Sequence, residues 1–142
     1  MRRLVQFVRL AAPDRALLLE AMAGLVVAGI SLRLFRFARL AARLGTHMAE
    51  SPLEQDRSKA AEAVRIRWAV ETAARHLPWK PMCLPQAVAA QRMLRRRGIP
   101  STLYLGVDPG RGYGAHAWVR AGRVVVTGGP RPDHFAVVST FA

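Results

Sequence analysis

The sequence predicts an α+β protein in which helices come first and an antiparallel sheet follows. Up to residue 97, apolar side chains recur at helical spacing, in runs that end at Gly45, at Leu77-Pro78 and at Gly98. Residues 102–140 instead form short runs of apolar and β-branched side chains, separated by turns rich in glycine and proline. The only cysteine, Cys83, lies just before the last predicted helix.

The first helical stretch starts at Pro13-Asp14, where Asp14 is the predicted N-cap. It continues through residues 16–32, of which Ala21 to Leu32 is an uninterrupted apolar run. A bilayer span needs about 20 such residues, so we expect a helix buried in the protein or covered by a partner. From residue 32 to Gly45 the helix becomes amphipathic. Arginines recur there at helical spacing, and they are Arg33, Arg36, Arg39 and Arg43.

Two further helices precede the sheet. One begins at Ser51, which has capping-box spacing to Glu54, or at Ser58, and it ends near His76. The other runs from residue 86 to residue 97, and Pro85 suits its first turn. The four predicted strands are 102–107, 115–120, 123–127 and 134–140. We expect an N-terminal helical segment, 1–50, and a core domain, 51–142, with a single compact domain as the alternative.

The composition restricts the compartment and the partners. One cysteine excludes an internal disulfide and a multi-cysteine zinc site, and it fits a reducing cytoplasm. The net charge of +13 arises from 22 basic and 9 acidic residues, and nearly all the basic ones are arginines. Such a chain is expected to bind acidic partners, which include peptides, proteins, nucleic acid and anionic lipid. We find no phosphate-binding or metal-binding motif.

Cys83 is the candidate nucleophile. A helix N-terminus carries partial positive charge and free N–H donors, which favour the reactive thiolate. His116 is the candidate base, because it lies on a predicted strand beside small residues that leave space around it. His134 is the second choice. The competing interpretation is that Cys83 is a small buried side chain without chemistry.

Four segments together resemble one family. They are Cys83-Leu84-Pro85-Gln86-Ala87, Leu94-Arg95-Arg96-Arg97-Gly98-Ile99-Pro100, Leu105-Gly106-Val107 and Ala115-His116-Ala117-Trp118-Val119. This combination is similar to the leader peptidases of lasso-peptide biosynthesis, which are transglutaminase-like B proteins. The similarity covers residues 79–142 well and the N-terminal half more loosely. The chain resembles the standalone protease half of a split system.

The resemblance implies a papain-like, transglutaminase-like cysteine protease core, in which the Cys-bearing helix packs on an antiparallel sheet after N-terminal helices. Cys83 would attack the carbonyl at the junction between leader and core peptide, and His116 would transfer the proton. Backbone N–H groups around Cys83 would stabilise the oxyanion. The side chains expected near the oxyanion and substrate are Leu84, Gln86, Trp79 and Trp118.

The resemblance also implies the partners of the reaction. They are a precursor leader peptide, a separate leader-binding recognition protein and an ATP-dependent lasso cyclase that closes the macrolactam ring. No cofactor, metal or nucleic acid is expected, and membrane contact is not favoured.

The sequence departs from the family pattern at the third catalytic position. The family has an aspartate about a dozen residues after the histidine, but Thr127-Gly128-Gly129 stands there. The candidates for this role are Asp133, Asp108 and a backbone carbonyl that would orient the imidazole.

Two other functions remain open at this point. A transglutaminase-like acyltransferase would pass the acyl group to an amine instead of water. A non-catalytic, arginine-rich adaptor would bind an acidic partner and leave Cys83 inert.

Overall fold

The predicted order of helices followed by an antiparallel sheet is confirmed by a computed structural model, which describes residues 7–112, 114–129 and 132–142. The helices are α2 (Ala12–Leu34), α3 (Phe37–Ala41), α4 (Arg57–His76) and α5 (Cys83–Arg96). The strands are β1 (Thr102–Asp108), β2 (Gly114–Ala121), β3 (Val124–Thr127) and β4 (Ala136–Phe141). Two short 3-10 turns, η1 (Pro109–Arg111) and η2 (Pro132–His134), lie between strands.

The four strands form one antiparallel sheet in the order β3-β2-β1-β4. β1 and β2 are the central pair, and their register places Gly106 opposite His116 and Tyr104 opposite Trp118. β3 and β4 are at opposite edges, so the chain that joins them must cross from one edge of the sheet to the other.

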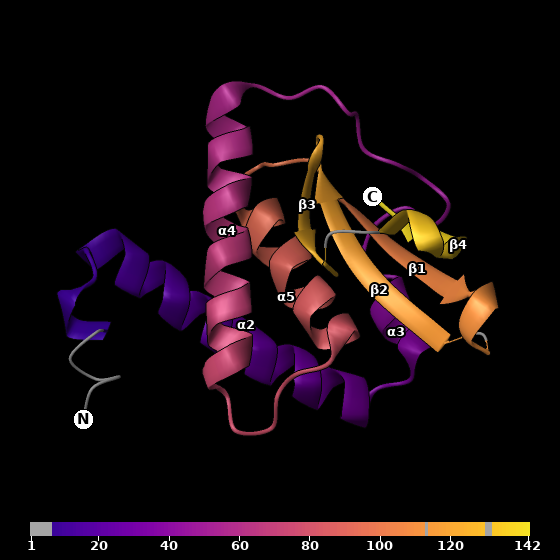
Figure 1. Ribbon diagram of the computed structural model, residues 1–142, viewed down its shortest axis with the longest axis horizontal. Helices are drawn as coiled ribbons and strands as arrows, with labels where there is room; N and C mark the ends of the chain where they lie inside the picture. The colour runs from indigo at the N-terminus through magenta and orange to yellow at the C-terminus, as the bar shows by residue number, and fades with distance from the viewer. Residues whose placement is uncertain (1–6, 113, 130–131) are drawn as a thin grey trace.

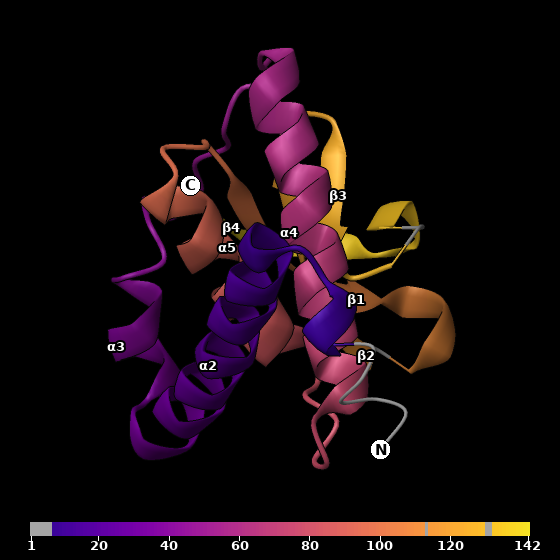
Figure 2. The same cartoon turned by 90° about the vertical axis from the view of Figure 1, so that its left-hand side faces the viewer.

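The helices form two layers on one side of the sheet. α4 and α5 pack directly on the sheet, α4 mainly against β3 and α5 mainly against β2. α2 packs on α4 and α5 from the far side (Figures 1 and 2). Gly24 permits the close approach of α2 to α5, because a Cβ there would already contact Cβ of Ala89 at 3.4 Å.

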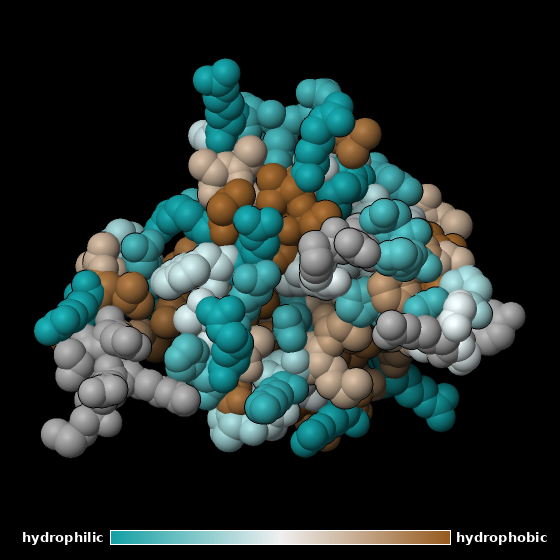
Figure 3. Space-filling view, viewed as in Figure 1, coloured by the Kyte–Doolittle hydropathy of each residue, from teal (hydrophilic) through white to brown (hydrophobic). Residues whose placement is uncertain are grey.

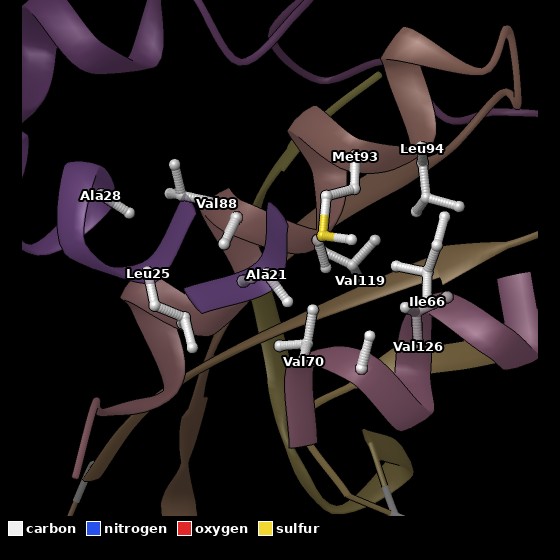
Figure 4. Close-up of a cluster of buried hydrophobic side chains, with 14 of the residues drawn as sticks. Ala21, Leu25, Ala28, Ile66, Val70, Val88, Met93, Leu94, Val119 and Val126 are labelled. Carbon is white, nitrogen blue, oxygen red and sulfur yellow. The ribbon is translucent and has the colours of Figure 1, made fainter. Parts of the chain in front are cut away.

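The core lies between these layers. Small residues of α2, including Ala21 and Ala28, face Val88 of α5, while Ile66 of α4 faces the sheet residue Val126 (Figure 4). All five of these side chains are fully buried. Alternation along β2 sends Ala117 and Val119 into the same core. Residues of the predicted segment 1–50 therefore share one hydrophobic core with the predicted domain 51–142, and the division between them stays a prediction.

Four predicted helix boundaries are wrong: three concern α2 and α4, and the fourth is the start of α5, which lies at Cys83 instead of Gln86. α2 begins at Ala12, because Pro13 occupies its first turn, and Asp14 lies inside the helix, where its carboxylate pairs with Arg65 at 2.9 Å. The helix also stops at Leu34, and an extended Phe35-Arg36 separates it from the short α3. α4 is capped by Asp56, which accepts a hydrogen bond from the Lys59 amide at 2.9 Å.

α2 is, among the described helices, the one long and apolar enough to cross a membrane by length and composition alone. Such a test is also passed by core helices, and Ala21, Leu25 and Ala28 of α2 are fully buried against α4 and α5. The outer face of α2 leaves Leu19, Val27 and other apolar side chains exposed. On the face viewed in Figure 3, apolar patches alternate with hydrophilic side chains.

Candidate active site

Cys83 is the first residue of α5, three positions earlier than the predicted helix start at Gln86. The first helical hydrogen bond runs from the amide of Gln86 to the carbonyl of Met82, at 3.3 Å. The amides of Cys83 and Leu84 therefore precede the helical ladder, and Pro85 has no N–H to satisfy. Free N–H donors thus lie next to the thiol, as an oxyanion site requires.

The loop before Cys83 is held by specific bonds. The side-chain amide of Gln86 donates to the carbonyl of Pro81 at 2.7 Å, and the backbone amide of Lys80 donates to the carbonyl of Leu77 at 3.2 Å. Lys80 has a φ of 42°, a left-handed conformation that costs a residue with a Cβ about 1–2 kcal/mol. Strain of this kind is concentrated at functional sites.

Cys83 and His116 line the same cavity, which has a volume of about 990 Å³. Both residues are half-buried. The cavity is enclosed by α2, by the loop before α5 and by the sheet, and its walls include Ile30, Phe37, Trp79, Leu105 and Val138. Cys83 and His116 therefore both contribute to the walls of one cavity, and their roles as nucleophile and base stay predictions.

The orientation of His116 is fixed by one hydrogen bond and two stacking contacts. Its Nε2 lies 2.7 Å from the carbonyl oxygen of Gly128. A carbonyl only accepts hydrogen bonds, so Nε2 must carry the proton, and Nδ1 is the proton acceptor of the neutral ring. The ring also stacks on Phe135, with 4.6 Å between centroids, and on Trp118, with 6.0 Å between centroids.

Position 128 requires a glycine, because its backbone conformation and its contact with Trp118 leave no room for a side chain. Its φ is 98°, and a Cβ on it would lie only 2.2 Å from Cβ of Trp118. Only glycine fits so close to Trp118, and this approach is what places the Gly128 carbonyl on the imidazole. Sequence reasoning left the carbonyl open as one of three choices, and the adjacent glycines Gly128-Gly129 were the available signal.

Asp108 and Asp133, the two aspartates considered for the third catalytic position, form no hydrogen bond with His116 in the described structure. The Asp108 carboxylate accepts a hydrogen bond from the Gly110 amide at 2.9 Å and so caps η1. Asp133 is exposed in η2. Among the described residues, neither aspartate is hydrogen-bonded to His116, and the carbonyl of Gly128 occupies that position.

The four side chains expected near the substrate divide into two pairs. Trp79 and Leu84 line the cavity beside Cys83. Gln86 is absent from the described lining and instead holds the loop through Pro81. Trp118 is also absent from the described lining and is buried on the opposite side of the sheet from the helices. There it stacks on Tyr104, with 5.2 Å between ring centroids, and on the candidate base His116, with 6.0 Å between ring centroids.

The remaining histidines are absent from the described lining of the cavity. His47 is hydrogen-bonded through Nε2 to Oγ of Ser139 at 2.7 Å, and Nδ1 of His76 lies 2.7 Å from the carbonyl of Thr72. His134 is exposed in η2, outside the described lining of the cavity.

A family model described as the transglutaminase-like superfamily matches residues 25–140. The chain belongs to the transglutaminase-like superfamily. This superfamily includes cysteine proteases and acyltransferases. The curated proteins and the solved structures contain no significant match to the chain.

The superfamily match begins inside α2 and ends in β4, so it covers Cys83, His116 and the cavity between them. Within the described residues, no hydrogen bond joins the thiol to the imidazole. Catalytic hydrogen bonds are often long without substrate and tighten when it binds. A thiol at a helix start, an imidazole with a free Nδ1 and nearby backbone donors are the parts that acyl transfer through a cysteine needs.

Proposed function

We propose that this protein is a cytoplasmic cysteine peptidase that removes the leader from a ribosomally made lasso-peptide precursor. The observation that carries the proposal is that Cys83 and His116 share one cavity while the Gly128 carbonyl fixes the imidazole tautomer. Membership of the transglutaminase-like superfamily supports cysteine chemistry in general. The four segments similar to lasso leader peptidases support this particular substrate.

In the proposed reaction, Nδ1 of His116 accepts the thiol proton while Nε2 keeps its bond to Gly128. The Cys83 sulfur attacks the carbonyl at the leader–core junction, and the amides of Cys83 and Leu84 stabilise the oxyanion. His116 then protonates the leaving amine of the core peptide. Water attacks the acyl-enzyme and releases the leader, and the freed amine passes to an ATP-dependent cyclase.

Recognition of the leader is assigned to a separate leader-binding protein, as the resemblance to split systems suggests. The exposed arginines at the end of α2 and around α3, which are Arg33, Arg36, Arg39 and Arg43, are the proposed docking surface. A second arginine group consists of Arg92, Arg95 and Arg96 on α5 and Arg97 directly after it. This group is less suited to the role, because some of its members already stabilise the fold. Arg97 binds Glu20 at 2.6 Å and Glu62 at 3.1 Å, and Arg95 donates to the carbonyl of Leu44 at 2.8 Å.

The test uses wild-type protein and Cys83→Ala with a precursor peptide and a leader-binding protein encoded in the same gene neighbourhood. Intact-mass spectrometry should show free leader and free core with the wild type and uncleaved precursor with the variant. Because Cys83 is half-buried at the cavity, the variant should keep the wild-type melting temperature. Wild-type cleavage by Cys83→Ala would overturn the assignment.

The same mass spectra separate the alternatives. Leader joined to an added amine, such as glycine amide, would indicate acyl transfer instead of hydrolysis. An adaptor would leave the precursor intact, and its thiol would react slowly with iodoacetamide, whereas a peptidase thiol reacts quickly at neutral pH.

A further inference from the structure

The cavity beside Cys83 has exposed apolar walls. Ile30 of α2 is 52% exposed, Trp79 of the loop is 51% exposed and Val138 of β4 is 57% exposed, and all three line it. Exposed apolar side chains that converge on one hollow are typical of ligand-binding clefts. The bulky side chains lie on the α2 and β4 walls as well as next to the thiol, so the apolar surface extends beyond the reacting atoms.

The charged side chains that line the cavity are all basic in the described lining. Arg33 on α2 and Lys80 on the loop line it, and its described lining contains no aspartate or glutamate. Arg33 is exposed, and no ion pair is formed by it within the described residues. A guanidinium in this position matches the geometry of a carboxylate.

The edge of the sheet at this cavity is open. β4 is an edge strand, and its C-terminal part is covered by residues 46–48, because the amide of Met48 donates to the carbonyl of Thr140 at 2.8 Å. Residues 136–138 are exposed and form no such pair within the described chain. Unpaired backbone groups at a sheet edge accept extended peptides as an added strand.

We propose that this cavity binds an extended peptide segment that inserts a bulky apolar side chain between Ile30 and Val138 and places an aspartate or glutamate beside Arg33. The inference rests on the proposed peptidase function and names the class of sequence next to the cleaved bond. The open edge of β4 favours an extended peptide as the ligand. The apolar walls favour a bulky apolar side chain on that peptide, and Arg33 favours a negatively charged one.

The experiment measures binding without chemistry. Cys83→Ala protein is incubated with a positional-scanning library of N-acetylated, C-amidated octapeptides, and bound peptides are identified by mass spectrometry. We expect Leu, Ile, Met or Phe to be enriched at one position and Asp or Glu at another. Adding Arg33→Glu should lower the enrichment of acidic residues about fivefold, the factor that matches an exposed ion pair of up to about 1 kcal/mol.

Two further variants sharpen the result. Ile30→Ser should reduce the apolar enrichment and keep the acidic one. Arg67→Glu makes the same charge change at an exposed position of α4 outside the described lining, and it should alter neither preference. Absence of any positional enrichment, or an acidic preference that survives Arg33→Glu, would overturn the inference.

Failure of this inference and failure of the proposed function are distinguishable. If the wild type cleaves the precursor but Cys83→Ala selects no apolar and acidic residues, only the inference is wrong. If the selection is observed but the wild type does not cleave, the binding site stands and the peptidase assignment falls.

Discussion

Replacing Gly128 by alanine should test the role of the Gly128 carbonyl in orienting His116 while leaving the other residues of the site unchanged. The new Cβ would lie 2.2 Å from Cβ of Trp118, whereas ordinary contact begins near 3.4 Å, so the chain must shift by about 1 Å. The Gly128 carbonyl would move with it and lose its 2.7 Å contact with Nε2. A hydrogen bond to a charged partner contributes roughly 1.5–3 kcal/mol, so turnover should fall about 10- to 100-fold.

Gly129→Ala is the matched control. Gly129 also has a positive φ, 81°, but a Cβ there would meet no atom within 4 Å. Both variants should lose about 1–2 kcal/mol of unfolding free energy from the unfavourable φ, and Gly128→Ala should lose about 1–3 kcal/mol more from overpacking. Thermal denaturation gives the stability, and single-turnover cleavage at a temperature where both variants are folded gives the rate.

A spectroscopic readout distinguishes orientation from general damage. In ¹⁵N-histidine-labelled protein, a proton on Nε2 that is protected by the Gly128 carbonyl should give a slowly exchanging imidazole N–H signal. The signal should persist in Gly129→Ala and disappear in Gly128→Ala. If Gly128→Ala is folded and cleaves as fast as Gly129→Ala, the carbonyl does not serve as the orienting group.

Three other outcomes are expected. His116→Ala should lower turnover at least about 100-fold because the general base is lost, while His134→Ala should stay near the wild-type rate in the same assay. Arg36→Glu combined with Arg39→Glu should raise the leader-binding protein concentration needed for half-maximal cleavage, and salt from roughly 50 to 500 mM should mimic the change by screening; an unchanged half-saturation point would exclude docking through these arginines. Glu20→Gln should lower Tm at pH 7, because Arg97 and Arg96 hydrogen-bond to that carboxylate and hold its pKa below the usual 4.5. This stabilisation is present above pH 4.5 and is lost as pH falls through the lowered pKa, so melting curves of wild type and variant should converge once the pH is below that lowered pKa.

The order of helices and strands was predictable because the spacing of apolar residues and the positions of glycines and prolines agree along most of the chain. Gly98 ends the last helix and has a φ of 64°, and the four predicted strands correspond to β1–β4 with shifts at their ends. The boundaries that failed depend on choices between neighbouring residues. Asp56 and Ser58 can each cap a helix; the structure uses Asp56, and the hydroxyl of Ser58, inside the helix, donates to the Asp56 carboxylate at 2.6 Å.

Single residues in the sequence supplied the candidates for the site, whereas tertiary packing decided the walls of the cavity. Cys83 and His116 could be named as candidates because one is the sole cysteine and the other lies in a strand beside small residues. Both line one cavity, and their chemical roles stay predictions. The apolar walls from Ile30 and Val138 could not be named, since no local pattern shows that α2 and β4 meet near the start of α5. Gln86 could not be assigned from the sequence to the role it has in the structure, because its hydrogen bond to the Pro81 carbonyl depends on how the preceding loop folds.

Gly128 stands where the resembled family has the aspartate that orients the histidine, and the backbone contact made by Gly128 explains this difference. An acid at this position would orient the imidazole through its side chain, whereas here the backbone itself reaches Nε2. The backbone can do so only by passing against Trp118, and this contact leaves no room for a Cβ on residue 128. A carbonyl carries a partial charge and a carboxylate a full one, so the carbonyl can fix the tautomer but supports the imidazolium less strongly. We therefore infer that orientation is the part of the third residue's role kept in this chain, and that the imidazolium is stabilised less here than it would be by a carboxylate.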